Sequence, residues 1–212
     1  MSFTEDCRNC PRLAGFLDQV RADHPDYHAR PVSSFGAAGS RFLIVGLAPG
    51  MHGANRTGRP FTGDHAGNLL YGTLHKYGFA TRAEPLDASG NANRALSLQG
   101  CRITNAVRCL PPQNKPEPAE VRACNGYLGE ELAALPQGAA VMALGAIAHQ
   151  AVLMSLQLRK SAHVFAHAAR HELPGGLTLF DSYHCSRYNT QTRRLTTEMF
   201  EAVVADISRH VA

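Results

Sequence analysis

The sequence predicts an α/β fold in which helices flank a mainly parallel sheet of about four strands. Four short apolar segments, at residues 42–45, 103–109, 139–144 and 178–183, have the composition of buried strands. Segments with helical spacing of apolar residues alternate with them, which is the order that produces parallel sheets. At 212 residues, 44% of them hydrophobic, the chain is long enough to form one domain (1–212) around a substantial core.

The helices are predicted from the spacing of apolar residues and from their end signals. In the first, Leu13, Leu17 and Val20 lie on one face. Proline or glycine marks the ends of several others. Helices are expected over residues 11–23, 65–77, 116–135, 145–158 and 190–209. Residues 84–97 are polar and rich in Asn and Ala, and we expect them to form a loop or a small insertion.

Composition and charge restrict the class of protein. A net charge of +4 and a pI near 8.8 permit binding to nucleic acid without requiring it. The sequence contains no run of 18 apolar residues, so no membrane span is expected. The N-terminus carries Glu5, Asp6 and two cysteines in place of an export signal, so we expect a cytoplasmic protein with reduced thiols.

The segment from Arg41 to Asp64 predicts a binding site. A buried strand ends in Gly46-Leu47-Ala48-Pro49-Gly50 and releases a polar loop, as strands of open α/β sheets do at ligand sites. The loop lacks the Gly-Lys-Ser/Thr of a P-loop and the G-x-G-x-x-G of a dinucleotide site. Its arginines favour an anionic ligand. The polar and aromatic residues of the loop are His52, Asn55, Arg56, Arg59, Phe61 and Asp64.

Two further strands end in polar residues. The strand at 178–183 leads into His184, with Ser186, Arg187 and Asn189 directly behind it. The strand at 103–109 carries Asn105 where packing alone would favour an apolar residue. Because the carboxyl ends of parallel strands meet at one edge of a sheet, Asp64, Asn105 and His184 are expected to share a pocket.

Four of the six cysteines have the spacing of a metal site. Cys7 and Cys10 form a C-x2-C pair, and fourteen residues separate Cys109 from Cys124. In a cytosolic protein such a pair indicates a metal more often than a disulfide, and both zinc and iron–sulfur clusters use four thiolates. The alternative is that these cysteines are small buried hydrophobes. Cys101 fits a core strand, and Cys185 is expected to pack beside His184.

Three separated motifs, in the same order, resemble the B-type (family 5) enzymes of the uracil-DNA glycosylase superfamily. They are GLAPG-x-HGANRTGR-x-FTGD, TNAVRC and HCSRYNTQT-x-RLT. The resemblance covers nearly the whole chain. It implies a three-layer α/β/α sandwich and a monomeric, monofunctional DNA glycosylase that removes uracil, and other deaminated bases such as hypoxanthine, from DNA. It also implies a [4Fe–4S] cluster bound by Cys7, Cys10, Cys109 and Cys124.

The resemblance also implies roles for individual residues. Asp64 would act on the sugar side of the glycosidic bond, and His184 would donate a hydrogen bond to O2 of the base. Asn105 would read the Watson–Crick edge and Phe61 would stack on the base. Gly46, Ala48 and Asn189 would complete the substrate site. Arg187 and Tyr188 would form a wedge that enters the duplex, and Arg193, with Arg194, would bind phosphate.

The residues taken alone permit other interpretations. An Asp before a helix is often only an N-cap, as Asp64 would be for the helix at His65. The resemblance also has a departure: better-known branches of the superfamily carry an acidic or amide residue in the loop after the first strand, where this sequence has Leu47 and Ala48. The lack of a polar residue there fits a pocket that accepts several bases. The three motifs contain no lysine, so a Schiff-base lyase has no candidate there. The rival hypothesis is a non-catalytic iron–sulfur protein that binds nucleic acid or senses redox state, against which Asp64 argues.

Overall fold

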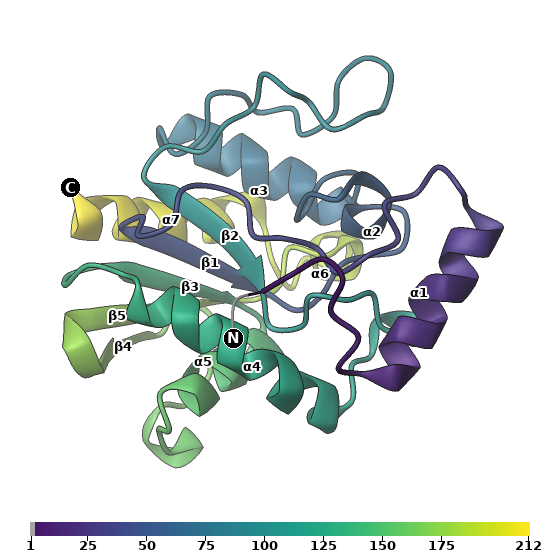
Figure 1. The fold of residues 1–212 in the computed structure, drawn as a ribbon. Helices are drawn as coiled ribbons and strands as arrows, with labels where there is room; N and C mark the ends of the chain where they lie inside the picture. Colours follow the sequence, from purple (N-terminus) through teal and green to yellow (C-terminus); the bar gives the residue numbers. More distant parts are fainter. Residues whose placement is uncertain (1–2) are drawn as a thin grey trace.

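A computed structural model describes residues 3–212 and shows a sheet between two layers of helices (Figure 1). The strands run in the order β2-β1-β3-β5-β4. The first four are parallel, and β4 pairs antiparallel with β5 at the edge. The three-layer α/β/α prediction is therefore confirmed. The strands are β1 (Phe42–Gly46), β2 (Cys101–Asn105), β3 (Ala140–Leu144), β4 (Arg170–Leu173) and β5 (Leu177–Ser182).

The fifth strand corrects the prediction of about four. β4 has the sequence Arg-His-Glu-Leu, and only Leu173 in it is buried. An edge strand needs no continuous apolar run, because one of its sides faces solvent. Its pairing with β5 follows a short turn at Pro174–Gly176.

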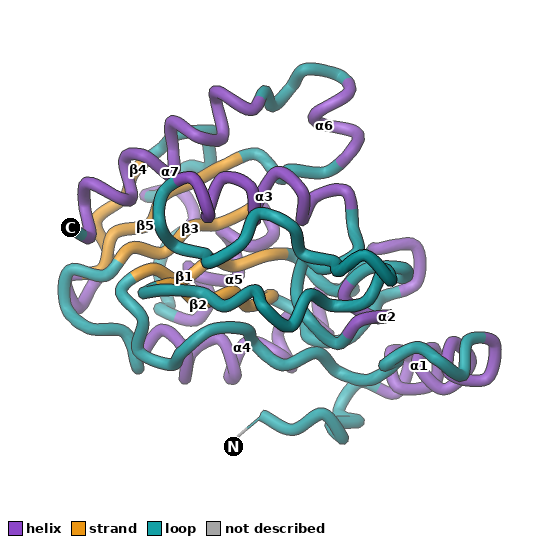
Figure 2. Tube along the Cα trace, turned by 90° about the horizontal axis from the view of Figure 1, so that it is seen from above, coloured by secondary structure: helices purple, strands orange, loops and turns teal. Residues whose placement is uncertain are grey.

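Helices cover both faces of the sheet, as the view from above shows (Figure 2). Alternate residues of β1 face opposite layers: Leu43 and Val45 pack on the side of α1, α4 and α5, whereas Phe42 and Ile44 pack on the side of α3 and α7. Both faces are buried, which explains why the parallel strands read as continuous apolar runs. The helices are α1 (Pro11–Asp23), α2 (Ala54–Thr57), α3 (His65–Lys76), α4 (Pro118–Ala133), α5 (Ala146–Ser155), α6 (Arg187–Gln191) and α7 (Thr197–Val211).

The C-terminal helix differs from the prediction of a single element over 190–209. The structure has a short α6 and a long α7, separated at residues 192–196. Arg193 has a left-handed φ of 58°, which interrupts a helix. Thr196 then caps α7, its side chain accepting a hydrogen bond from the Met199 N–H at 3.2 Å.

Residues 84–97 form a loop, as expected, and it packs beside the first polar loop. Arg56 donates to the Gly90 carbonyl and Arg59 to the Asn93 carbonyl, each at 2.9 Å. These contacts join two long loops on the side of the sheet that carries α3 (Figure 1). Among the helices of the described chain, none has the length and apolar character to cross a membrane.

Candidate active site

A pocket of about 520 Å³ opens at the carboxyl edge of the sheet, where β1, β2 and β5 end. It brings together Asp64, Asn105 and His184, the three side chains predicted from their strand ends to converge. Phe61, Ala48 and Arg187 from the predicted set also line it. The remaining lining residues are Leu47, Gly50, Ala54, His65, Ala66, Asn114 and Ser186.

Asp64 stands at the N-cap position of α3, but its side chain makes no cap hydrogen bond with that helix. Instead the carboxylate accepts a hydrogen bond from the Ala54 backbone N–H. Burial raises the pKa of the Asp64 carboxyl, and this hydrogen bond together with the nearby His52 and Arg56 opposes the rise. The capping interpretation is therefore not what the structure shows: the carboxylate is a pocket group.

Two glycines make room for this carboxylate. A Cβ at Gly53 would lie 1.9 Å from the Asp64 carboxylate, and one at Gly50 would lie 2.7 Å from it. Any side chain at Gly53 would therefore displace Asp64. Gly50 and Gly53, which belong to the G-L-A-P-G and H-G-A-N segments, therefore leave the space in which the Asp64 carboxylate lies.

Asn105 lies at the end of β2 with its side chain 3% exposed. Within the described part of the chain its Oδ1 atom is buried and has no hydrogen-bond partner. Buried amide oxygens are nearly always paired, so an unpaired acceptor facing a pocket suits a ligand that donates. Gly46 lies opposite, and a Cβ there would come within 2.3 Å of Oδ1.

Phe61 forms the apolar wall of the pocket. Its backbone adopts a left-handed φ of 54°, which is unusual for a bulky residue, and a Cβ at Gly67 would lie 1.7 Å from its carbonyl oxygen. The Phe61 ring lies 6.0 Å from that of His184, with 29° between the ring planes. A strained aromatic held against the pocket is typical of a functional position.

His184 follows β5 and faces the pocket. Burial lowers its pKa to about 4, so the imidazole is neutral at neutral pH. The Asn189 side chain donates to the His184 carbonyl oxygen at 2.8 Å and does not line the pocket. Asn189 thus holds the backbone of this loop, whereas the family resemblance predicts that it contacts substrate.

The two arginines of the first loop do not face a ligand. Arg56 and Arg59 are engaged by backbone carbonyls of the 84–97 loop, and Arg59 also lies over the Phe35 ring at 4.9 Å. Neither arginine lines the pocket, and each gives at least one donor to that loop, so their observed role is to hold the loop, and the attraction of an anion stays a prediction. His52, another polar residue of this loop, has its Nδ1 atom 2.8 Å from the Tyr27 hydroxyl and lies outside the pocket lining.

The predicted DNA-binding residues lie on one side of the pocket mouth. Arg187 is exposed and lines the pocket, and Tyr188 is 70% exposed in the same short helix, α6. Arg193 is exposed just beyond α6, and Arg194 stacks over the Tyr183 ring at 4.6 Å. The Ser186 side chain caps α6, accepting from the Asn189 N–H at 3.4 Å.

The four cysteines of the predicted metal set line one small pocket between the N-terminal segment, the loop after β2 and α4. Burial raises the pKa of the Cys109 thiol to about 12 and also raises the pKa of Cys124 and Cys10. No three of these sulfurs lie within 4.8 Å of one another in the described chain. The structure brings the four predicted cysteines together.

Comparison with known proteins identifies the family to which the chain belongs. A sequence model of the uracil DNA glycosylase superfamily matches residues 33–208. The chain belongs to this superfamily. The type-5 uracil-DNA glycosylase of Thermus thermophilus is 50% identical over 96% of this chain and 93% of its own. The type-5 enzymes of Mycobacterium tuberculosis and Pyrobaculum aerophilum are 39% and 36% identical, over 96% and 94% of this chain and 77% and 86% of their own.

Two polar residues that line the pocket were not predicted from the sequence. Asn114 lies in the Pro112–Asn114 turn with a left-handed φ of 57°, and His65 begins α3 with its Nε2 atom 3.1 Å from the Thr190 hydroxyl. The position of Asn114 after β2, at the same edge as Asn105, was the signal that could have found it. Leu47 and Ala48 do line the pocket, so its floor is apolar at these positions.

Proposed function

We propose that the protein is a DNA glycosylase that hydrolyses the N-glycosidic bond of uracil in DNA and leaves an abasic site. The observation that carries this proposal is the pocket itself, in which a partly buried carboxylate, an unpaired amide oxygen and a neutral imidazole converge. The relatives bear the name type-5 uracil-DNA glycosylase, and the same activity accounts for the arrangement found here.

Asp64 is proposed to act on the sugar. Cleavage of the bond makes the sugar carbon cationic, and a nearby carboxylate either stabilises that charge or orients the attacking water. The carboxylate already accepts a hydrogen bond from Ala54, which fixes its position before substrate arrives. Its raised pKa reflects the cost of holding a charge in a partly buried place, where electrostatic effects on the reaction are strongest.

His184, Asn105 and Phe61 are proposed to act on the base. A neutral imidazole donates one hydrogen bond, here to O2 of uracil, where negative charge accumulates as the base leaves. The Asn105 Oδ1 atom would accept from N3–H of uracil. Phe61 would stack on the flipped base. The apolar Leu47 and Ala48 make no polar demand on the base, which supports acceptance of other deaminated bases such as hypoxanthine.

The exposed residues beside the pocket are proposed to contact DNA. Arg187, Arg193 and Arg194 would meet phosphates, and Tyr188 would enter the duplex as the target nucleotide leaves it. We propose that the protein acts as a monomer, as the resemblance to the B-type enzymes implies.

Cys7, Cys10, Cys109 and Cys124 are proposed to hold a [4Fe–4S] cluster. When bound, the cluster supplies a covalent link between the N-terminal segment, the loop after β2 and α4. The residues around it suit that role: the Arg108 N–H donates to the Cys124 sulfur at 3.4 Å, and the Cys7 sulfur lies 3.6 Å from the Tyr127 hydroxyl. Hydrogen bonds of this kind stabilise thiolate ligands.

An oligonucleotide with one deoxyuridine tests the activity. The protein should convert it to a product that breaks only after alkali, because removal of the base leaves the strand intact until alkali causes β-elimination of the 3′ phosphate at the abasic site. Asp64→Asn should lower the single-turnover rate roughly 10²-fold or more, the scale of losing one group that acts in the transition state. DNA affinity should change little. An uncut strand after alkali, with DNA binding retained, would favour the non-catalytic alternative.

A further inference from the structure

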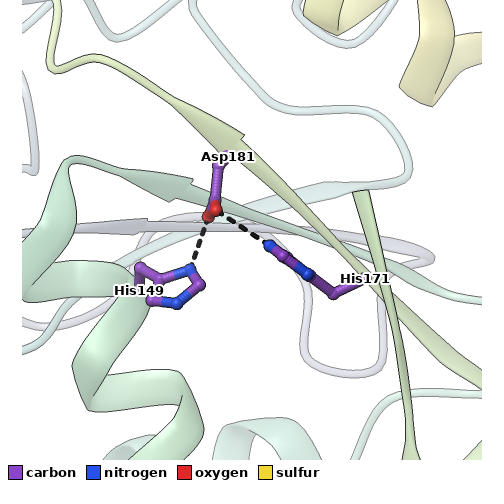
Figure 3. Close-up of side chains that lie close together, drawn as sticks. All are labelled: His149, His171 and Asp181. Carbon is purple, nitrogen blue, oxygen red and sulfur yellow. Dashed lines mark hydrogen bonds and ion pairs between the residues drawn. The ribbon is translucent and has the colours of Figure 1, made fainter. Parts of the chain in front are cut away.

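A second polar cluster lies away from the pocket and takes no part in the proposed reaction. It consists of His149 on α5, Asp181 on β5 and His171 on β4 (Figure 3). The His149 Nδ1 atom is 2.8 Å from Asp181 Oδ1, and the His171 Nε2 atom is 3.2 Å from Asp181 Oδ2. One ligand atom from each residue lies within 4.8 Å of the others. We propose that this His149–Asp181–His171 cluster binds a divalent metal ion, with zinc the preferred ion.

Charge is the first reason. Asp181 is 0% exposed and His149 is 2% exposed. Within residues 3–212, His149 and His171 are the side chains that pair with the Asp181 carboxylate, and no lysine or arginine pairs with it. A buried carboxylate without a compensating charge is costly, so a cation between the three side chains would stabilise the site.

The orientation of His149 is the second reason. Its Nε2 atom lies 2.9 Å from the His163 carbonyl oxygen, to which it donates a proton. Its Nδ1 atom donates to the Asp181 carboxylate at 2.8 Å, so a metal ion would displace the Nδ1 proton and the lone pair of this nitrogen would then be directed at the ion. Histidines that bind metals commonly have this arrangement, in which the second ring nitrogen donates to a backbone carbonyl and fixes the tautomer.

The chemistry of the donors and the access to them complete the case. Two imidazoles and a carboxylate suit zinc better than magnesium or calcium, which prefer oxygen ligands. His171 is 13% exposed and gives the ion a path from solvent. The His163 ring lies 5.6 Å from that of His171, so either it or water can supply a fourth ligand. The ion would tie α5, β4 and β5 together just before β5 reaches His184.

Titration of the purified protein with zinc chloride, followed by calorimetry and by thermal unfolding, tests the proposal. The wild type should bind one zinc ion and unfold at a higher temperature with zinc present. His171→Ala removes a proposed ligand and should weaken this binding roughly 100-fold or more, beyond the loss typical of a residue that only supports a ligand, and Asp181→Asn should abolish it while keeping the shape of the side chain. His75→Ala, which removes an exposed histidine from α3, is the matched control and should bind as the wild type does.

The four cysteines are unchanged in all of these variants, so a difference in zinc uptake cannot come from them. Iron measured in the same samples verifies that they are equally loaded. If Asp181→Asn fails to fold, His171→Ala still decides the matter, because His171 reaches the surface. Equal zinc uptake by the wild type and His171→Ala would overturn the proposal. So would a wild type that binds no zinc, since the buried charge would then be balanced by a proton on His149.

Discussion

Single residues at the pocket have properties that their sequence neighbours do not reveal. Asp64 precedes a helix and would be read as a cap, yet its carboxylate is turned away from α3 toward Gly50, Gly53 and Ala54. His184 is neutral because burial lowers its pKa to about 4, not because of a hydrogen-bond partner. Both effects come from the surroundings that folding creates, and both place the residue in a defined state before substrate binds.

The lowered pKa of His184 predicts a pH dependence of stability. Between pH 6.5 and about 4 the unfolded histidine takes up a proton that the folded one resists, so stability should fall as the pH falls through this window. His184→Ala should remove that part of the dependence, whereas His75→Ala should retain it. Thermal unfolding at a series of pH values measures this, and identical profiles for wild type and His184→Ala would contradict it. Titration of His184 should also cause no change in the single-turnover rate near pH 6.5.

At the scale of elements, the loop after β1 depends on glycine. Gly53→Ala would place a Cβ 1.9 Å from the Asp64 carboxylate and displace it, so we expect a large loss of single-turnover rate with DNA binding retained. Gly72→Ala on α3 is the control, because a Cβ there meets nothing within 4 Å. It should keep full activity and add about 0.5–1 kcal/mol of stability. Equal rates for the two variants would mean that Asp64 does not need its present position.

The region around α6 gives a second prediction at this scale. If Arg187, Arg193 and Arg194 meet phosphates, replacing all three with alanine should weaken binding to any DNA sequence. The dependence of log affinity on log salt should become shallower by roughly one unit for each phosphate that an arginine no longer neutralises. Arg122→Ala, an exposed arginine on α4, should leave the slope unchanged. An unchanged slope in the triple variant would make the three arginines ordinary surface residues.

For the molecule as a whole, the four-cysteine pocket joins segments that are far apart in the sequence. Loss of the proposed cluster should therefore lower the stability of the whole protein. Cys109→Ala should give a colourless protein that lacks iron and unfolds at a lower temperature. Cys101→Ala removes a buried cysteine of β2 that is outside the proposed ligand set. This variant should keep its iron and the brown colour expected of an iron–sulfur protein. Iron analysis and thermal unfolding measure both. A colourless wild type that contains zinc or no metal would contradict the cluster assignment.

The sequence by itself determined the parallel core and the meeting of Asp64, Asn105 and His184. A strand buried on both faces must be an apolar run, and parallel strands end at one edge, so the polar residues that follow each run are brought together. The family followed from three motifs in order, and the superfamily match over residues 33–208 confirms it. These features depend on patterns within short segments, and such patterns are visible in the amino-acid sequence.

Only the tertiary structure decided the contacts between distant segments. Arg56 and Arg59 have the character of anion ligands in the sequence, but each donates a hydrogen bond to a backbone carbonyl of the 84–97 loop. The strand β4 has no apolar run, because it forms an edge. His149, His171 and Asp181 belong to no motif, and only the packing of α5 on β4 and β5 joins them. The physical reason is the same in each case: a polar side chain takes its role from its partner, and the partner is chosen by the fold.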